Sequence, residues 1–188
     1  MMTRSAGVDG FFIHPVAELE VIIGNGGIGL EIFFQCPDVE VIVVPFGGGG
    51  MISGIALAMK ALGKAPLIVA CEIESSTPLK SAKSKGEPVK VERGKSWIDG
   101  IGSTSVLPDM WPLLDELVDS VVVVSHSEAE AALRSLSAKA HLVAEGAGAV
   151  ALAAAMKPQF SGKNIVAVIS GGNIDPKIYG EILDYSSS

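Results

Sequence analysis

The stretch VIVVPFGGGGMISGIALAMKA, residues 41–61, decides the fold that this chain can adopt. Its first four residues are β-branched and precede Pro45, which predicts a buried strand, while the Ala, Leu and Met near its end predict a helix. Four consecutive glycines therefore lie at a strand-to-helix turn. Each of them loses much backbone freedom on folding, so the run indicates a backbone that must come close to a ligand. The unpaired N–H groups of a helix start favour an anion, above all a phosphate, and a tight turn with close helix-to-sheet packing is the alternative.

Composition and charge restrict the class of protein. The 188 residues are enough for one domain with a sizeable core, and a net charge of -7 without a Lys/Arg run argues against nucleic-acid binding. Hydrophobic residues make up 48 per cent, but the longest uncharged run, residues 41–59, contains a proline and four glycines, which argues against a membrane span. Cys36 and Cys71 lie far apart, and the chain start does not resemble a signal peptide, so we expect a cytoplasmic protein without disulfides.

Further strands are predicted after the first helix, at residues 67–71, 121–124 and 163–169. Two parallel strands joined by a helix form a right-handed βαβ unit. The predicted fold class is therefore α/β, with an open, mostly parallel twisted sheet and helices on both faces. Ligands of such sheets bind at the carboxyl ends of strands, where the four glycines lie. Glu72 follows the second strand at this edge, as a metal ligand or, in the interpretation that we favour, as a solvated strand end.

Other segments are predicted from turn and capping signals. Gly24, Gly26 and Gly29 fit the pattern G-x-G-x-x-G, but no strand precedes them, so we expect a loop followed by a helix at residues 28–35. The run SWIDGIG, residues 96–102, is predicted to form a defined loop. The remaining expectations are a loose start at residues 1–10, a short strand at 11–14, a helix at 107–117, a helix at 127–140 with Ser127 and Glu130 as capping box, and a frayed tail at 179–188.

Two late segments contain polar side chains that can carry chemistry. Glu145 is the only charged residue in LVAEGAGAVALAAAM, residues 142–156. Isolated carboxylates in apolar surroundings are costly and are enriched at active sites, but Glu145 also lies near a helix start, where its charge suits the dipole. Both interpretations stay open on these residues alone. Ser170 ends the last strand, at the same edge as the glycine turn if the strands are parallel, although the Gly-Gly-Asn that follows is also ordinary turn chemistry.

Five ordered segments together resemble the large domain of the fold-type II pyridoxal phosphate enzymes, specifically the threonine dehydratase and serine racemase group. The matching segments are HPVAELEVIIGNGGIGLEI, VPFGGGGMISGIALAMK, WIDG, AEGAGAVALAAA and VISGGNID. They span nearly the whole of residues 11–175. The resemblance implies that residues 11–185 form a pyridoxal-phosphate-binding large domain and that the cofactor is pyridoxal 5'-phosphate.

The resemblance also implies roles for particular residues. Ser170 would place its hydroxyl against the pyridine nitrogen, and a neutral hydroxyl makes the ring a milder electron sink than a carboxylate would. Glu145 matches a carboxylate close to the cofactor, which favours its functional interpretation. Glu72 matches a residue that binds a divalent cation, Mg²⁺ or Ca²⁺, in some relatives, but the expected second acid does not follow it. The cofactor phosphate would be held by the backbone N–H groups of Gly47, Gly48, Gly49, Gly50 and Met51.

The sequence departs from the family pattern in two places. GNGG at residues 24–27 replaces the usual GQGT. The amino-terminal segments S-x-K-x-R-G, with the lysine that forms the Schiff base, and S-S-G-N-H, which holds the substrate carboxylate, have no counterpart. We therefore expect this chain alone to be inactive, as a truncated sequence or as the carboxyl half of a longer or split enzyme.

The implied activity of the complete enzyme is that of an ammonia-lyase. Elimination across the α and β carbons of threonine or serine gives ammonia and a 2-oxo acid. The alternatives are a serine racemase-like activity, or a catalytically inactive remnant that acts as a binding or interaction module. The expected partners are the small amino acid and either further copies in a homo-oligomer or a complementing amino-terminal fragment, because a half fold exposes apolar faces.

Overall fold

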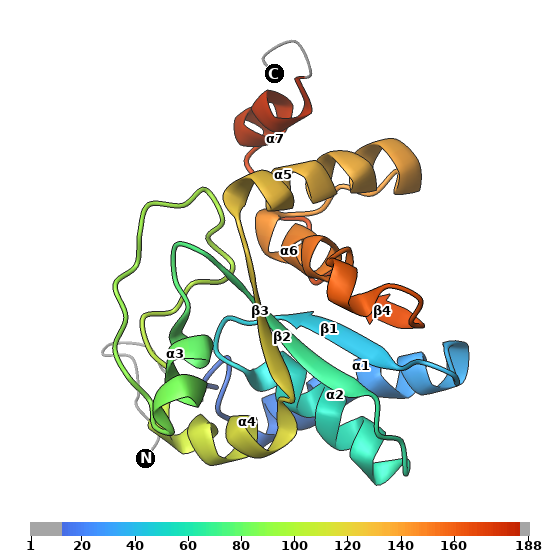
Figure 1. The fold of residues 1–188 in the computed structure, drawn as a ribbon, viewed down its shortest axis with the longest axis vertical. Coiled ribbons are helices and arrows are strands. Elements are labelled where there is room, and N and C mark those ends of the chain that lie inside the picture. Colours follow the sequence, from blue (N-terminus) through green and yellow to red (C-terminus); the bar gives the residue numbers. More distant parts are fainter. Residues whose placement is uncertain (1–12, 185–188) are drawn as a thin grey trace.

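The sheet has the predicted parallel arrangement. In the computed structural model, which describes residues 13–184, strands β1 (Val41–Pro45), β2 (Leu67–Ile73), β3 (Ser120–Val124) and β4 (Ile165–Ala167) lie in the order β3-β2-β1-β4 (Figure 1). Each neighbouring pair is parallel. β1 pairs with both β2 and β4, so the strand that precedes the glycine turn lies inside the sheet. The predicted α/β class is confirmed.

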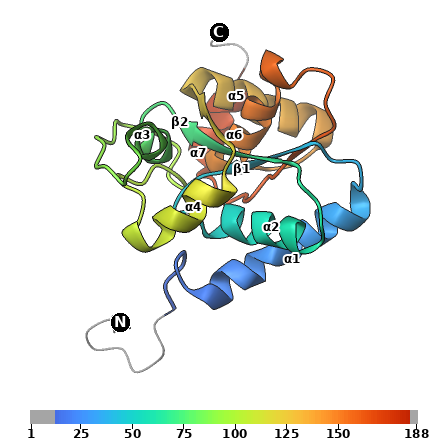
Figure 2. The same ribbon diagram turned by 60° about the horizontal axis from the view of Figure 1, so that its bottom comes forward.

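Helices cover both faces of the sheet. One layer contains α1, α2 and α4, and the opposite layer contains α5 and α6, with α7 packed outside α5 (Figure 1, Figure 2). Among residues 13–184, no helix is long and apolar enough to cross a membrane. The bounds are α1 Leu19–Gln35, α2 Gly50–Ala61, α3 Pro78–Lys85, α4 Trp111–Leu117, α5 His126–Ser135, α6 Gly146–Ala155 and α7 Pro176–Leu183, with short turns of other helix types at Pro108–Met110, Leu136–Ala140 and Pro158–Phe160.

Alternate residues of the central strand contribute to two separate cores. Val41 and Val43 belong to the core that includes α5 and α6, while Ile42 and Val44 belong to the core that includes α1, α2 and α4. All five residues of β1 are buried. Burial on both faces explains why this strand is a continuous β-branched run rather than an alternation of apolar and polar residues.

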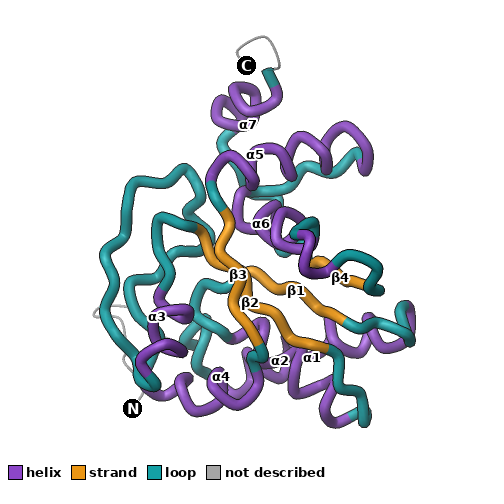
Figure 3. Tube along the Cα trace, viewed as in Figure 1, coloured by secondary structure: helices purple, strands orange, loops and turns teal. Residues whose placement is uncertain are grey.

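The chain reverses its direction across the sheet next to β1. The connection from β1 to β2 passes through α2 on one face, and the connection from β3 to β4 passes through α5 and α6 on the other (Figure 3). The neighbours of β1 are therefore reached over opposite faces. Open parallel sheets bind ligands at the carboxyl ends of the two strands that flank such a switch point, which here are β1 and β4.

The first helix is longer than the sequence predicts. α1 begins at Leu19 and continues through residues 24–27, where the sequence predicts a loop before a helix at residues 28–35, and it ends at Gln35 as predicted. Contact with α2 is the physical reason, because a Cβ on Gly29 would lie 2.8 Å from Cβ of Ala58 and 2.9 Å from the carbonyl oxygen of Ile55. The absence of side chains lets the two helices approach closely, and this packing offsets the low helix propensity of glycine.

The capping box of α5 lies earlier than predicted. Ser125 accepts the N–H of Glu128, and the Glu128 carboxylate accepts the N–H of Ser125, whereas the sequence analysis favours Ser127 and Glu130. The S-x-x-E pattern occurs twice in the run SHSEAE, and only Ser125 directly follows β3. The end of the strand therefore determines which serine caps the helix.

Predictions at the two chain ends have mixed outcomes. The loose start at residues 1–10 and the first half of the strand at 11–14 lie outside the described residues, while Ile13 and His14 form no strand. The tail predicted to fray from residue 179 instead contains α7, which extends to Leu183. The Asp175 carboxylate caps this helix by accepting two backbone N–H groups of its first turn, an interaction that the sequence analysis did not consider.

Candidate functional site

A cavity of about 260 Å³ lies at the carboxyl end of the sheet, next to the end of β1. Its walls come from the turn after β1, from the segment after β4 and from the start of α6. The cavity therefore occupies the switch point of the topology. Of the predicted site residues, those that line it are Gly47, Gly48, Gly49, Gly50, Met51, Glu145 and Ser170. The fold brings all predicted site residues together except Glu72.

The turn after β1 requires glycine for two reasons. Gly49, the residue before α2, has a φ of +99°, which residues with side chains rarely adopt. A Cβ on Gly49 would also lie 2.8 Å from Cδ1 of Leu114, and a Cβ on Gly50 would lie 2.8 Å from the carbonyl oxygen of Val16. The parts of the protein that pack around this turn therefore leave space for backbone atoms but not for side chains.

This turn presents a helix start to the cavity. The Gly49 carbonyl accepts the N–H of Ser53 at 3.0 Å, which is the first hydrogen bond of α2. The N–H groups that precede Ser53 in the helix have no acceptor within it, and the positive end of the helix dipole lies at the same place. Ser103 donates its hydroxyl to the Gly47 carbonyl at 2.7 Å and so holds the first residue of the turn. Together these features suit a phosphate group.

Glu145 lines the cavity from the start of α6. It is the residue before the helix, but its side chain does not cap it, and its Oε2 instead accepts the N–H of Asn173 at 3.2 Å. Glycines make room for the carboxylate, because a Cβ on Gly100 would lie 2.8 Å from Oε1 and a Cβ on Gly171 would lie 2.7 Å from the carboxyl carbon. Glu145 therefore lies both at a helix start and in the cavity wall, so the two interpretations of its sequence position do not exclude each other.

Ser170 lines the cavity beyond the end of β4. The pairing of β4 with β1 continues past the strand, since the N–H of Val168 donates to the carbonyl of Val43 at 2.9 Å. The segments that lead to Ser170 and to the glycine turn are thus held side by side. Because Ser170 is exposed, its hydroxyl is available to a bound molecule.

Glu72 has a different role from either of those considered in the sequence analysis. Its side chain is buried, with 1 % exposure, so the favoured interpretation as a solvated strand end is wrong. The two carboxylate oxygens accept the N–H groups of Leu79 at 2.7 Å and Lys80 at 3.0 Å, in the first turn of α3. Burial raises the pKa of Glu72 to about 7, against the opposite effect of these two hydrogen bonds.

These contacts do not fit a cation site at Glu72. Both of its oxygens already face backbone donors, and a divalent cation needs several oxygen ligands. Within the part of the chain that the structure describes, no group of three or more His, Cys, Asp and Glu side chains is placed to hold a metal ion.

Several cavity residues were missed by the sequence analysis. Gly100 and Ile101 could have been found, because they belong to the SWIDGIG loop that was singled out. Asn25 had a weaker signal, as a polar residue among the glycines of the predicted loop. Val16 belongs to a segment that resembles the family, but no local pattern marks it as a cavity residue, and it reaches the cavity through tertiary packing.

Comparison with known proteins assigns the family. Residues 3–171 match the family described as pyridoxal-phosphate dependent enzyme. The chain belongs to this family. Its relatives include an L-threonine ammonia-lyase from Thermotoga maritima, which is 38% identical over 174 residues, covering 92% of this chain and 43% of that protein. A serine racemase from Mus musculus is 36% identical over 173 residues, covering 89% of this chain and 51% of the racemase.

Solved structures of other proteins also have this fold. The structure of maize serine racemase superimposes with a TM-score of 0.83 and 30% sequence identity, over 93% of this chain and 55% of that chain. The chain spans about half the length of the relatives that it matches. The resemblance to the threonine dehydratase and serine racemase group is confirmed, and the glycine turn at a helix start fits the phosphate of the family's cofactor.

Proposed function

We propose that this chain forms the cofactor-binding part of a pyridoxal phosphate-dependent ammonia-lyase that acts on threonine or serine. One observation carries the proposal: the glycine turn, Glu145 and Ser170 line a single cavity at the switch point of the sheet. The similarity to an L-threonine ammonia-lyase over 92% of this chain supports the reaction class. The products would be ammonia and a 2-oxo acid.

The residues of the cavity would divide the binding of the cofactor. The N–H groups of residues 47–51 would hold the phosphate, and the Ser170 hydroxyl would contact the ring nitrogen as a neutral partner. Glu145 would accept a hydrogen bond or a proton at the edge of the cofactor. Pyridoxal phosphate, when bound, supplies an electron sink that weakens the bonds at the α-carbon of an amino acid.

The lysine that binds the cofactor covalently in this family would come from a part of the protein beyond the matched half. Such a part needs a surface on which to dock. Such a surface is present on the outer face of α1, where four large apolar side chains are exposed: Leu19, Ile23, Leu30 and Phe34. This face could be covered by a complementing segment or by a second copy of this chain.

A serine racemase-like reaction is the second candidate, favoured by the 36% identity to the mouse serine racemase. It uses the same cofactor site and differs in returning a proton to the opposite face of the α-carbon. A non-catalytic binding module is the third candidate. It requires that the chain gain no activity when a complementing half from a relative is supplied.

Titration of the purified chain with pyridoxal phosphate tests the site, and co-expression with the amino-terminal half of the Thermotoga maritima enzyme tests the reaction. We expect binding by the chain alone, and release of ammonia and a 2-oxo acid from threonine or serine only in the complemented protein. D-serine formed from L-serine without ammonia would favour the racemase. Absence of cofactor binding would contradict the proposal.

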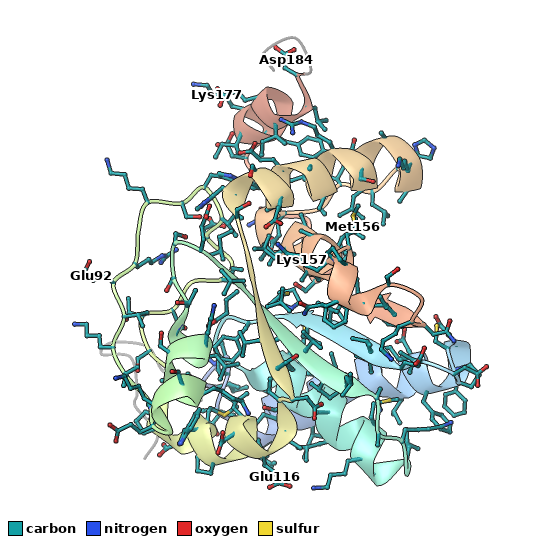
Figure 4. All side chains as sticks on the ribbon, in the orientation of Figure 1. Glu92, Glu116, Met156, Lys157, Lys177 and Asp184 are labelled. Carbon is teal, nitrogen blue, oxygen red and sulfur yellow. The ribbon has the colours of Figure 1, made fainter. Side chains whose placement is uncertain are left out.

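Two matched pairs of variants locate the binding. Ser170→Ala and Glu145→Gln are expected to weaken pyridoxal phosphate binding about ten-fold or more, since the first removes a hydroxyl from the cavity and the second removes the negative charge of a carboxylate. Ser161→Ala and Glu92→Gln make the same chemical changes at exposed positions and should leave it unchanged. Glu92 lies on the outer loop, with its side chain directed away from the sheet (Figure 4).

A further inference from the structure

Three polar side chains outside the cavity form a continuous hydrogen-bonded relay. Nδ1 of His126 lies 3.0 Å from Oε1 of Glu74, and its Nε2 lies 2.8 Å from the hydroxyl oxygen of Ser96. The residues come from three different places: Glu74 directly follows β2, His126 is the first residue of α5, and Ser96 lies in the long loop between α3 and α4 (Figure 1). The imidazole therefore connects this loop to the edge of the sheet.

The proton positions in the relay follow from its chemistry. The backbone N–H of His126, and then its imidazole, lower the pKa of Glu74, so this carboxylate is ionised at neutral pH and can only accept. Nδ1 is accordingly assigned the proton of the neutral ring, which leaves Nε2 to accept the Ser96 hydroxyl. Both ends are tied to the backbone as well, since Glu74 accepts the His126 N–H at 2.8 Å and Ser96 accepts the Ile98 N–H at 3.0 Å.

Two further contacts hold the ends of the same loop segment. The N–H of Gly94 donates to the carbonyl of Ser75 at 2.8 Å, and the Ser76 hydroxyl donates to the carbonyl of Ser103 at 2.7 Å. Ser103 in turn holds Gly47 of the glycine turn. The relay joins the sheet edge between these two anchors, so residues 94–103 are fixed at both ends and near Ser96.

The segment held in this way forms part of the cavity wall. Gly100 and Ile101 line the cavity, and Gly100 leaves room for the Glu145 carboxylate. The ring of Trp97 packs against Gly146, where a Cβ would lie 2.5 Å from it. A displacement of this segment would therefore also change the positions of the Glu145 carboxylate and of the glycine turn.

We propose that Glu74, His126 and Ser96 are positioning residues, and that their relay holds residues 94–103 as the wall of the cofactor cavity. The proposal rests on the proposed function, because it assigns the cavity to pyridoxal phosphate. A hydroxyl, an imidazole and a carboxylate in this order also occur in serine hydrolases. Here the backbone hydrogen bonds at both ends of the relay favour positioning over nucleophilic attack by Ser96.

Variants of the full chain test the relay. Ser96→Ala and His126→Ala are each expected to weaken pyridoxal phosphate binding about ten-fold, the effect typical of residues that support a ligand-binding shell. The double variant should bind no more weakly than either single variant, because one relay is broken in all three. His126→Gln should recover part of the affinity, since its amide can accept the Ser96 hydroxyl.

Ser125→Ala is the matched control. It removes the cap of α5 one residue away and so lowers the melting temperature, but it leaves the contacts of the loop in place. We expect its affinity for pyridoxal phosphate to equal that of the parent chain. An equal loss of affinity in Ser125→Ala, additive losses in the double variant, or unchanged affinity in Ser96→Ala and His126→Ala would each overturn the proposal.

Two measurements do not depend on the cofactor. The relay holds the Ser96 hydroxyl in place as the acceptor of the Ile98 N–H. Hydrogen exchange of the Ile98 amide in the ligand-free chain should therefore become about ten-fold faster in Ser96→Ala and in His126→Ala. It should stay unchanged in Ser125→Ala. If the parent chain binds no pyridoxal phosphate, the proposed function fails while this measurement still decides whether the relay holds the loop. Covalent labelling of Ser96 by a fluorophosphonate would overturn the positioning role in favour of a nucleophile.

Discussion

Residues 24–29 and residues 47–50 are both rich in glycine, yet the first lie in the middle of α1, whereas the second form the turn after β1 and the first residue of α2. In α1 the glycines have helical conformation, and their use is the close contact with α2 at Gly29. At the turn, Gly49 has a positive φ, and the backbone borders a cavity. The number of glycines in a stretch therefore does not identify a ligand site. A glycine run is identified as a ligand site by its position directly after a parallel strand at a switch point of the sheet.

Gly49→Ala is expected to have the largest effect. The substitution forces a side chain into a φ of +99° and places a Cβ 2.8 Å from Leu114. We predict a loss of about 3 kcal/mol in the free energy of unfolding and a loss of pyridoxal phosphate binding. Urea denaturation and cofactor titration measure both quantities. An unchanged affinity would mean that the conformation of the turn does not matter for binding.

Gly29→Ala should damage the fold and spare the site. Its Cβ would overlap Ala58 and the Ile55 carbonyl, which costs about 1 to 2 kcal/mol after the gain in helix propensity. Because α1 contacts α2 here away from the turn, the affinity of the folded chain for pyridoxal phosphate should not change. If Gly29→Ala lowered both the stability and the affinity for pyridoxal phosphate, the two glycine stretches would not have the different roles described above.

The pH dependence of stability is expected to be common to both sets of glycine variants, because none of them changes a titratable group. The pKa of Glu72 rises from an ordinary 4.5 to about 7 on folding. The folded chain then binds the proton more tightly, so this group's contribution to stability is present below pH 4.5 and is lost as the pH rises through about 7. Glu72→Gln should flatten this decline between pH 4.5 and 7, measured by denaturation at several pH values. A decline that persists in Glu72→Gln would assign it to another group.

Gly24→Ala should have the smallest effect, in the opposite direction. No atom lies within 4 Å of a Cβ at this position, so the added methyl group meets no neighbour. Better helix propensity should stabilise the chain by about 0.5 to 1 kcal/mol, and the cofactor affinity should stay the same. The variant is the matched control for Gly29→Ala, and a destabilisation would show that α1 does not tolerate side chains on this face.

The sheet could be predicted because its signal is local. Strands such as residues 41–45 are buried on both faces of the sheet, and a continuous run of β-branched residues is the sequence pattern typical of such burial. Parallel pairing then places the carboxyl ends of β1 and β4 together, which is why the glycine turn and Ser170 could be assigned to one edge. Glu145 was assigned to the same site only through the resemblance to the family.

The errors concern features set by tertiary contacts. Residues 24–27 belong to a helix because α1 packs against α2, and nothing in their own composition requires it. Glu72 is buried because the first turn of α3, which folds back over it, supplies two N–H donors. Val16 and the relay through His126 join segments that are far apart in the chain, so no local pattern announces them.

Binding of a phosphate by the glycine turn is tested most directly by amide chemical shifts in the isotope-labelled chain during titration with pyridoxal phosphate. We predict that the amides of residues 48–51 shift with pyridoxal phosphate and much less with pyridoxal, which lacks the phosphate, while those of residues 24–29 stay unchanged. Equal shifts with both compounds, or shifts confined to α1, would contradict the assignment of the turn as the phosphate site.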